Sequence, residues 1–229
     1  GYLNKQSWPD ARISGAKVSS IWTQDYELSA RIAKASCIEH ISSTLVELES
    51  RVDAILLARD DAENHLHFAR QFLLAGKPVY IDKPIALSMT ALHGLYDLQQ
   101  YSGQIFTCSA LTYGSEFCLS PEDRSELGDI TSVSASTPKS WEKYAVHIIE
   151  PVLKIINPDE PVIEANVYID SNESRSLSVR WGNDVRATFS TLGNMISPVQ
   201  IKLEGSNGSR TLVFKNSFSA FKDSSKIYF

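Results

Sequence analysis

The chain has 229 residues, of which 43% are hydrophobic and 21% are charged, a balance typical of a globular protein with a buried core. A net charge of −5 and the lack of any dense run of Lys and Arg exclude the basic surface with which proteins bind nucleic acid or an anionic membrane. Since no apolar run reaches the roughly 18 residues needed to cross a bilayer and no signal-peptide pattern opens the chain, we expect a cytoplasmic protein.

Strands and helices alternate in the first half of the chain. Apolar periodicity predicts strands at 16–22, 52–58, 78–81 and 104–110, and helices at 26–35, 62–75 and 88–101. Gly76 follows the second of these helices, where a glycine commonly ends a helix. Such alternation is typical of right-handed βαβ units, which form a parallel sheet with helices on both faces. We therefore predict that residues 1–110 form a Rossmann-like, doubly wound α/β domain.

The pattern changes after about residue 110. Runs typical of strands, separated by Asn, Gly, Ser and Asp turns, occur at 130–137, 162–170, 175–181, 185–191, 199–204 and 210–215. One clear helix interrupts them at 141–156, and the polar stretch 120–126 reads as a surface loop. We predict that residues 111–229 form an α+β domain with a large, mainly antiparallel open sheet.

A charged turn, Asp82-Lys83-Pro84, follows the strand predicted at 78–81. In open α/β sheets, ligands bind at the carboxyl ends of the strands, and the rigid Pro84 ends the strand at that point. Lys83 is therefore a candidate active-site lysine. The alternative is an ordinary surface lysine in a turn.

Five segments of the chain form a series of motifs: 52–58, His65, 75–84, 128–130 and 146–150. In order and spacing, from about residue 16 to residue 215, they resemble the Gfo/Idh/MocA family of glucose-fructose oxidoreductases and inositol dehydrogenases. The family pattern A-G-K-x-V-x-x-E-K-P is matched by 75–84, with Asp82 in the Glu position. The resemblance implies that Lys83 contacts the substrate hydroxyl beside the nicotinamide ribose.

The same resemblance implies that His147, which matches the histidine of a D-x-x-x-H helix motif, transfers the substrate proton. The acid of that motif is replaced here by Lys143. A second ammonium near Lys83 would raise the local positive potential and lower the basicity of the lysine. We expect substrate contacts from Lys83, Lys143, Tyr144 and His147, although Tyr144 could instead pack at a domain interface.

The resemblance also implies a nicotinamide cofactor. Thr23 aligns with the family's ribose-binding acid and is followed by Gln24 and Asp25, and Ala58-Arg59-Asp60 aligns with the loop on the adenine and ribose side. Asp82 and Lys83 would lie on the nicotinamide side. His65 reads equally well as a cofactor-side residue and as a structural or capping one. A neutral Thr23 removes the repulsion of a 2′-phosphate, but no adjacent arginine would hold one, so NAD and NADP both stay open.

Dinucleotide-binding domains usually begin with a strand and a G-x-G-x-x-G turn, and the printed sequence has neither. We expect a longer natural protein, lacking here its central strand and the closing helix that the family usually carries. Glu150 lies three residues after His147, a spacing that could bind metal, but no third ligand is evident and no metal is expected. The three cysteines are expected to be free and at least half-buried.

Two functions follow from the sequence. The first is an NAD(P)-dependent oxidoreductase that moves hydride to or from a hydroxyl or keto carbon of a sugar, polyol or related metabolite. The second, motivated by Lys143 and the missing glycine turn, is a catalytically silent relative that binds a ligand or a protein. The resemblance further implies a homo-oligomer formed through the C-terminal sheet.

Overall fold

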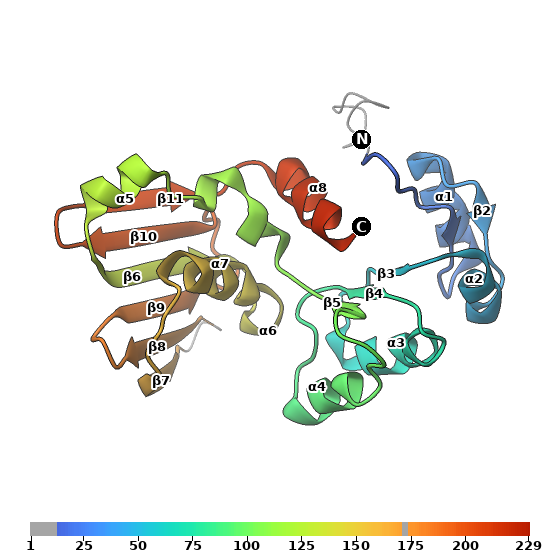
Figure 1. Cartoon of the computed structure of the whole chain (residues 1–229), viewed down its shortest axis with the longest axis horizontal. Coiled ribbons are helices and arrows are strands. Elements are labelled where there is room, and N and C mark those ends of the chain that lie inside the picture. The colour runs from blue at the N-terminus through green and yellow to red at the C-terminus, as the bar shows by residue number, and fades with distance from the viewer. Residues whose placement is uncertain (1–12, 171–173) are drawn as a thin grey trace.

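The computed structural model describes residues 13–170 and 174–229. Short parallel strands with their helices lie at one end of the molecule, and a broad sheet lies at the other end (Figure 1). No helix in the described ranges is both long enough and apolar enough to cross a membrane.

The parallel part contains two small sheets. β1 (Ser20–Ile21) pairs with β2 (His40–Ile41), and β3 (Ile55–Leu57), β4 (Val79–Ile81) and β5 (Ile105–Phe106) pair in that order. The helices are α1 (Tyr26–Ser36), α2 (Leu45–Arg51), α3 (His65–Leu74) and α4 (Met89–Tyr96), with a 3₁₀ turn, η2 (Ala62–Asn64), before α3. Phe72, Leu73, Val79, Ile81 and Leu95 are fully buried between these helices and strands. The predicted alternation and parallel pairing are confirmed.

The parallel strands are shorter than the apolar runs predicted. Only two residues of the run 16–22 pair, and 104–110 shortens to β5, because a strand extends only as far as its neighbour offers backbone partners. α4 ends at Tyr96 rather than at 101. The sequence analysis missed β2 and also α2, although Thr44 caps α2 by accepting a hydrogen bond from the Glu47 amide at 3.1 Å.

The broad sheet has six strands, in the order β11-β10-β6-β9-β8-β7, and only the β6–β9 pair is parallel. The strands are β6 (Ile130–Thr137), β7 (Val162–Ile169), β8 (Arg175–Trp181), β9 (Arg186–Thr191), β10 (Gln200–Gly205) and β11 (Ser209–Val213). The prediction of a large, mainly antiparallel sheet is therefore confirmed. The single helix predicted at 141–156 divides at Ala145 into α6 (Trp141–Tyr144) and α7 (Val146–Ile156).

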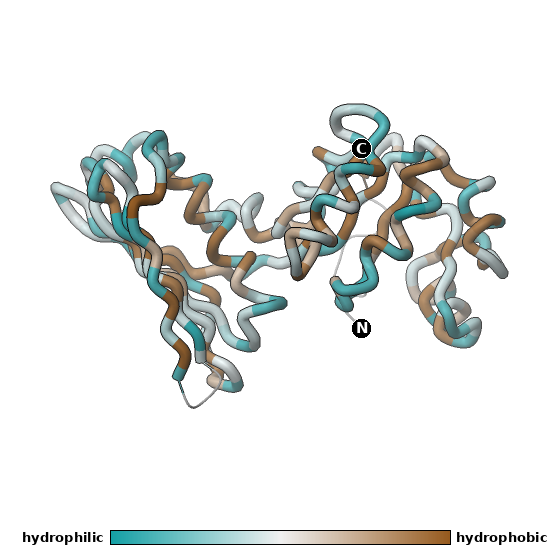
Figure 2. The backbone as a smooth tube through the Cα atoms, turned by 90° about the horizontal axis from the view of Figure 1, so that it is seen from below, coloured by the Kyte–Doolittle hydropathy of each residue, from teal (hydrophilic) through white to brown (hydrophobic). Residues whose placement is uncertain are grey.

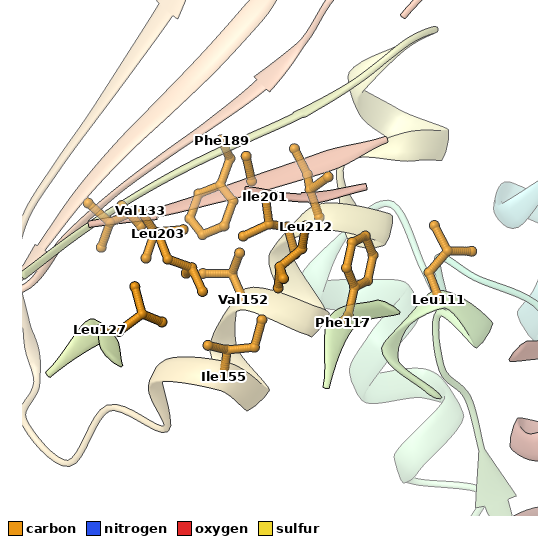
Figure 3. Packing of buried hydrophobic residues seen from close by; sticks show 14 of the residues in the cluster. Leu111, Phe117, Leu127, Val133, Val152, Ile155, Phe189, Ile201, Leu203 and Leu212 are labelled. Carbon is orange, nitrogen blue, oxygen red and sulfur yellow. The ribbon is translucent and has the colours of Figure 1, made fainter. Parts of the chain in front are cut away.

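One face of this sheet is covered by α7. Alternate strand residues point toward the helix, which is the period of two expected for a sheet with one buried face. Figure 3 shows Val133, Phe189, Ile201 and Leu203 of the sheet around Val152 of α7. Along the strands, hydrophobic and hydrophilic positions alternate in the same way (Figure 2). The core therefore fixes how α7 is rotated over the sheet.

Two further helices lie where the sequence analysis did not predict a helix. The stretch 120–126, predicted as a loop, lies in α5 (Pro121–Leu127), whose start is fixed by a capping box between Ser120 and Asp123. A closing helix, expected to be absent, is present as α8 (Ser217–Tyr228). The sequence analysis missed this helix because it lacks a stripe of large buried apolar residues. Its buried residues are the small Ala220 and Ser224.

α8 joins the two ends of the molecule. The Tyr228 hydroxyl lies 2.9 Å from the Ile55 carbonyl oxygen and 3.0 Å from that of Pro78, at the beginnings of β3 and β4. The Tyr228 ring packs 5.5 Å from Tyr80 and 5.9 Å from Phe106, measured between ring centroids. The C-terminal end of α8 therefore contacts the face of the parallel sheet that carries Tyr80 and Phe106 and points away from its buried Val79 and Ile81. Figure 1 shows this end of α8 directed toward the parallel strands.

All three cysteines are free, but two of them are not buried as expected. Cys108 is buried, whereas Cys37 and Cys118 are exposed. Cys37 ends α1 in the left-handed conformation with φ of 55°.

Gly205 lies where the chain leaves no room for a side chain. A Cβ at this position would approach the Leu127 carbonyl oxygen to 2.1 Å, and that oxygen belongs to backbone rather than to a movable side chain. We expect Gly205→Ala to lower the free energy of unfolding by about 2–3 kcal/mol, the range typical of overpacking. Urea denaturation followed by circular dichroism measures the change. Lys202→Ala, an exposed change on the same strand, is the control, and an equal stability of the two variants would contradict the prediction.

Candidate active site

Two side chains from different parts of the chain, those of Lys83 and His147, meet around the ring of Tyr144. The Lys83 Nζ, at the carboxyl end of β4, lies 5.4 Å from the centroid of the Tyr144 ring. The His147 ring, on the first turn of α7, lies 5.4 Å from the same ring in an edge-on arrangement. α6, which carries Tyr144, lies on the side of the broad sheet that faces β4 and β5 (Figure 1). The structure thus brings together Lys83, Tyr144 and His147.

The His147 side chain is buried, and a hydrogen bond to Ser109 orients its ring. Its exposed fraction is only 7%, and its Nδ1 lies 2.8 Å from the Oγ of Ser109, which is fully buried. The Ser109 amide in turn donates a hydrogen bond of 2.5 Å to the Glu150 carboxylate, one turn along α7. Ser109 and Glu150 therefore fix the orientation of the imidazole, and Nε2 is the ring nitrogen left free.

The pKa of His147 is lowered to about 4. Burial is the main cause, because it penalises the imidazolium, and the nearby Lys83 and Lys139 ammonium groups add to the effect. At neutral pH the imidazole is therefore uncharged and can accept a proton. Burial acts in the opposite sense on Glu150, whose pKa is raised even though it accepts the hydrogen bond from Ser109.

The shifted pKa of His147 makes stability depend on pH. An imidazole whose pKa falls from 6.5 in the unfolded chain to about 4 in the folded one stabilises the fold fully above about pH 6.5. That stabilisation, about 3 kcal/mol, is lost as the pH falls through about 4. We expect the unfolding free energy of the wild type to decrease by about this much more than that of His147→Asn between pH 7 and pH 4. Urea titrations at both pH values test this, and parallel losses in the two proteins would refute it.

Lys139 is a member of the site that the sequence analysis missed. It follows β6 with φ of 69°, a left-handed conformation rare for lysine. The Lys139 amide donates to the Gly193 carbonyl at 2.6 Å, which holds the turn in place. From there the Lys139 Nζ lies 4.4 Å from the Tyr144 ring centroid and 2.5 Å from its hydroxyl.

Lys143 does not join this group. Its Nζ forms an ion pair with the Asp60 carboxylate at 3.2 Å, in the loop after β3. The ammonium beside Lys83 and His147 is instead that of Lys139, four residues earlier in the chain. The Lys143–Asp60 pair links the segment before α7 to the parallel part of the molecule.

The residues predicted on the cofactor side also follow strand ends. Thr23 and Gln24 come after β1, and Asp25 caps α1 by accepting hydrogen bonds from the amides of Glu27 and Leu28. The Thr23 hydroxyl lies 2.8 Å from the Ser29 Oγ, so Thr23 helps to fix the same turn. These three side chains shape a loop at the end of β1.

Arg59 connects this loop to the next strand end. Its guanidinium forms two hydrogen bonds to the Asp61 carboxylate, at 2.8 and 2.5 Å, and one to the Gln24 side chain at 3.2 Å. It also lies 4.0 Å above the Phe68 ring. These contacts hold the pKa of Asp61 below its ordinary value. Arg59, with Ala58 and Asp60 beside it, is thus committed to fixing the loop rather than left free for a phosphate.

His65 is fully buried and supports two loops at once. Its Nε2 lies 2.9 Å from the Arg59 carbonyl oxygen and its Nδ1 lies 3.1 Å from that of Ile85. His65 therefore ties the loop after β3 to the segment just beyond Lys83 and Pro84. Both ring nitrogens of His65 thus lie next to backbone carbonyl oxygens.

The described residues could hold part of a dinucleotide cofactor. Loops after β1, β3 and β4 meet through the Gln24–Arg59 and His65–Ile85 contacts, and they offer polar groups for ribose and nicotinamide. The described residues contain no glycine-rich turn for the pyrophosphate. In residues 13–170 and 174–229, no three His, Cys, Asp or Glu side chains converge as metal ligands.

Part of the chain matches a known protein family. Residues 1–109 match the model of the Gfo/Idh/MocA family, described as the oxidoreductase family with an NAD-binding Rossmann fold. This part of the chain resembles that family in sequence. The observed site residues Lys83 and Arg59 therefore lie within a segment of Gfo/Idh/MocA sequence, whereas His147 and Tyr144 lie beyond it. No match was found among curated proteins.

Solved structures with the Gfo/Idh/MocA fold extend the likeness to the rest of the chain. Myo-inositol 2-dehydrogenase from Lactobacillus plantarum is 14% identical with a TM-score of 0.74, over 95% of this chain and 81% of that one. Biliverdin reductase from Synechocystis sp. PCC 6803, in complex with biliverdin and NADP+, is 14% identical with a TM-score of 0.69, over 91% and 80%. GenD2 from gentamicin A biosynthesis, in complex with NAD, is 14% identical with a TM-score of 0.73, over 93% and 78%. At sequence identities this low, the likeness shows that the fold is shared and nothing further.

Proposed function

We propose that this protein is an NAD(P)-dependent oxidoreductase that transfers hydride to or from a hydroxyl or keto carbon of a small sugar- or polyol-like metabolite. The observation that carries the proposal is the meeting of Lys83, from the strand-end loop, with a neutral, oriented His147 across the ring of Tyr144. A cation that binds the substrate oxygen and a neutral imidazole that accepts its proton are groups suited to alcohol oxidation.

In this proposal, the Lys83 ammonium binds the substrate oxygen and stabilises the negative charge that develops on it. His147 accepts the hydroxyl proton through Nε2, and this role requires the tautomer with its proton on Nδ1, which lies 2.8 Å from the Ser109 Oγ. The tilted ring of Tyr144 shapes the space between the two groups. In the reverse direction the same groups return the proton to the carbonyl oxygen.

We assign cofactor binding to residues 1–110 and the substrate side of the site to residues 111–229. The loop carrying Thr23, Gln24 and Asp25 would face the adenosine ribose, and Asp82 and Lys83 would lie on the nicotinamide side. When bound, the nicotinamide supplies the hydride chemistry. Ala58, Arg59 and Asp60 would line the adenine side, with His65 as their support.

The experiment that tests the proposal is a fluorescence titration with NADH and NADPH, followed by a screen of alcohols and ketones with the cofactor that binds. We expect saturable binding of at least one cofactor and turnover of at least one hydroxyl or keto compound. Binding of neither cofactor would refute the proposal. Binding without turnover, for a broad set of substrates, would favour the silent relative.

We also propose that the protein forms a homo-oligomer through the broad sheet. β7 is an edge strand, and its residues Val162, Ile163, Val167, Tyr168 and Ile169 are all exposed. An exposed apolar edge of this kind pairs readily with another chain. Multi-angle light scattering measures the mass in solution, and a monomer at all concentrations would contradict the proposal.

A further inference from the structure

Two ammonium groups lie near the ring of Tyr144. The Lys83 Nζ is 5.4 Å and the Lys139 Nζ is 4.4 Å from its centroid, and Lys139 also donates to the Tyr144 hydroxyl. Neither lysine forms an ion pair with a carboxylate anywhere in the described part of the chain. The Asp82 carboxylate accepts a hydrogen bond from the Lys83 amide, and the Asp60 carboxylate pairs with Lys143.

Two ammonium groups near one ring, neither of them in an ion pair among the described residues, raise the electrostatic energy of the protein there. Like charges repel, and their field also lowers the pKa of the neighbouring His147. A bound anion would relieve this repulsion, and lysine ammonium groups with a phenol hydroxyl are suitable donors for its oxygens. The charge arrangement therefore points to a negatively charged partner.

The backbone of Lys139 supports a role for its side chain. A left-handed φ of 69° is unfavourable for a lysine, whereas a glycine would adopt it freely. Residues kept in such conformations cluster at functional sites. Here the conformation turns the side chain of Lys139 back toward Tyr144 and the histidine behind it.

We propose that Lys83, Lys139 and Tyr144 form a subsite for an oxyanion, a carboxylate or phosphate group, carried by the substrate close to its reacting carbon. This inference rests on the proposed function and narrows its substrate class to hydroxy or keto acids and phosphorylated sugars or polyols. Lys139 is then a specificity-determining residue, since it contacts the anionic group rather than the reacting oxygen.

Three matched probes test the subsite without turnover: D-gluconate, D-glucose 6-phosphate and the neutral D-glucitol. Each is titrated into the protein while the imidazole signals of His147 are followed by NMR. We expect at least one anion to bind about tenfold or more tightly than D-glucitol, because it makes charge-assisted hydrogen bonds. The bound anion should also raise the pKa of His147. Binding of gluconate alone identifies a carboxylate subsite, and binding of glucose 6-phosphate alone identifies a phosphate subsite.

Lys139→Gly is the decisive variant, because the backbone at this position favours glycine and the variant should fold at least as well as the wild type. It should lose about tenfold in anion affinity, keep its affinity for D-glucitol, and show a higher His147 pKa. Lys139→Arg should retain most of the anion affinity, and Lys202→Gly, on the exposed side of β10, controls for loss of a lysine.

Equal affinities for the three probes, no measurable binding of either anion, or unchanged anion affinity in Lys139→Gly would each overturn the inference. Because the readout is probe binding, these outcomes are separable from failure of the proposed function. That failure would appear as a lack of NADH and NADPH binding in a protein that still binds the anions.

Discussion

Replacing Lys83 by methionine is expected to lower the rate of hydride transfer by about 10³-fold or more while leaving cofactor affinity within about threefold. Methionine keeps the length and most of the volume of the lysine side chain, so the packing after β4 is retained. The ammonium next to Tyr144 is lost, and with it the charge that stabilises the developing alkoxide. Stopped-flow measurement of NAD(P)H absorbance, with a substrate from the screen, gives the rate, and cofactor fluorescence gives the affinity.

The matched control for this change is Lys77→Met. Lys77 lies near the other end of β4, and its ammonium donates to the Val52 carbonyl oxygen at 2.8 Å, away from the site. We expect Lys77→Met to keep wild-type rates. A Lys83→Met protein that turns over substrate at an undiminished rate would remove Lys83 from the catalytic role.

Replacing His147 by asparagine is expected to lower turnover by about 10²–10⁴-fold, the usual contribution of a general base. Asparagine can keep a hydrogen bond to Ser109 but has no group that accepts a proton near neutral pH. The loss should shrink as the pH rises, because hydroxide and solvent increasingly remove the substrate proton. The measurement is the pH profile of kcat/KM for alcohol oxidation between pH 6 and pH 10, and a variant with the wild-type profile would refute the role.

Ser109→Ala separates positioning from proton transfer. It removes the hydroxyl that orients His147 but leaves the imidazole in place. We expect an intermediate loss of rate, a change in the tautomer of His147 detectable by NMR, and partial rescue in Ser109→Thr. A loss as large as that of His147→Asn would instead indicate that Ser109 itself takes part in the chemistry.

The fold class could be predicted from the sequence because it depends on alternation of apolar residues, which local patterns record. The lengths of the parallel strands could not, since β1 and β5 end where their neighbours offer no further backbone partners. α5 had a readable signal in Ser120, Pro121 and Asp123, which the sequence analysis took for a polar loop. α8 gave little signal in the sequence, because few large apolar residues of that helix are buried.

Some residues of the candidate site could likewise be predicted from the sequence, and others could not. Lys83 could be found because a charged turn at the end of a buried strand is a local signal, and His147 because its flanking residues resemble a family motif. Ser109 also follows a strand end, but a serine in that position is too common to stand out. Lys139 depends on a left-handed turn held by Gly193, 54 positions later, and no local pattern records such a contact.

The contact between Tyr228 and the parallel strands has a consequence for synthesis of the chain. The aromatic rings of Tyr80 and Phe106 pack against Tyr228, which is synthesised more than 120 residues after either of them. During translation, residues up to β5 can form their helices and buried core, but this aromatic face stays in water until α8 has left the ribosome. A nascent chain arrested before α8 should therefore bind chaperones or hydrophobic dyes through this surface.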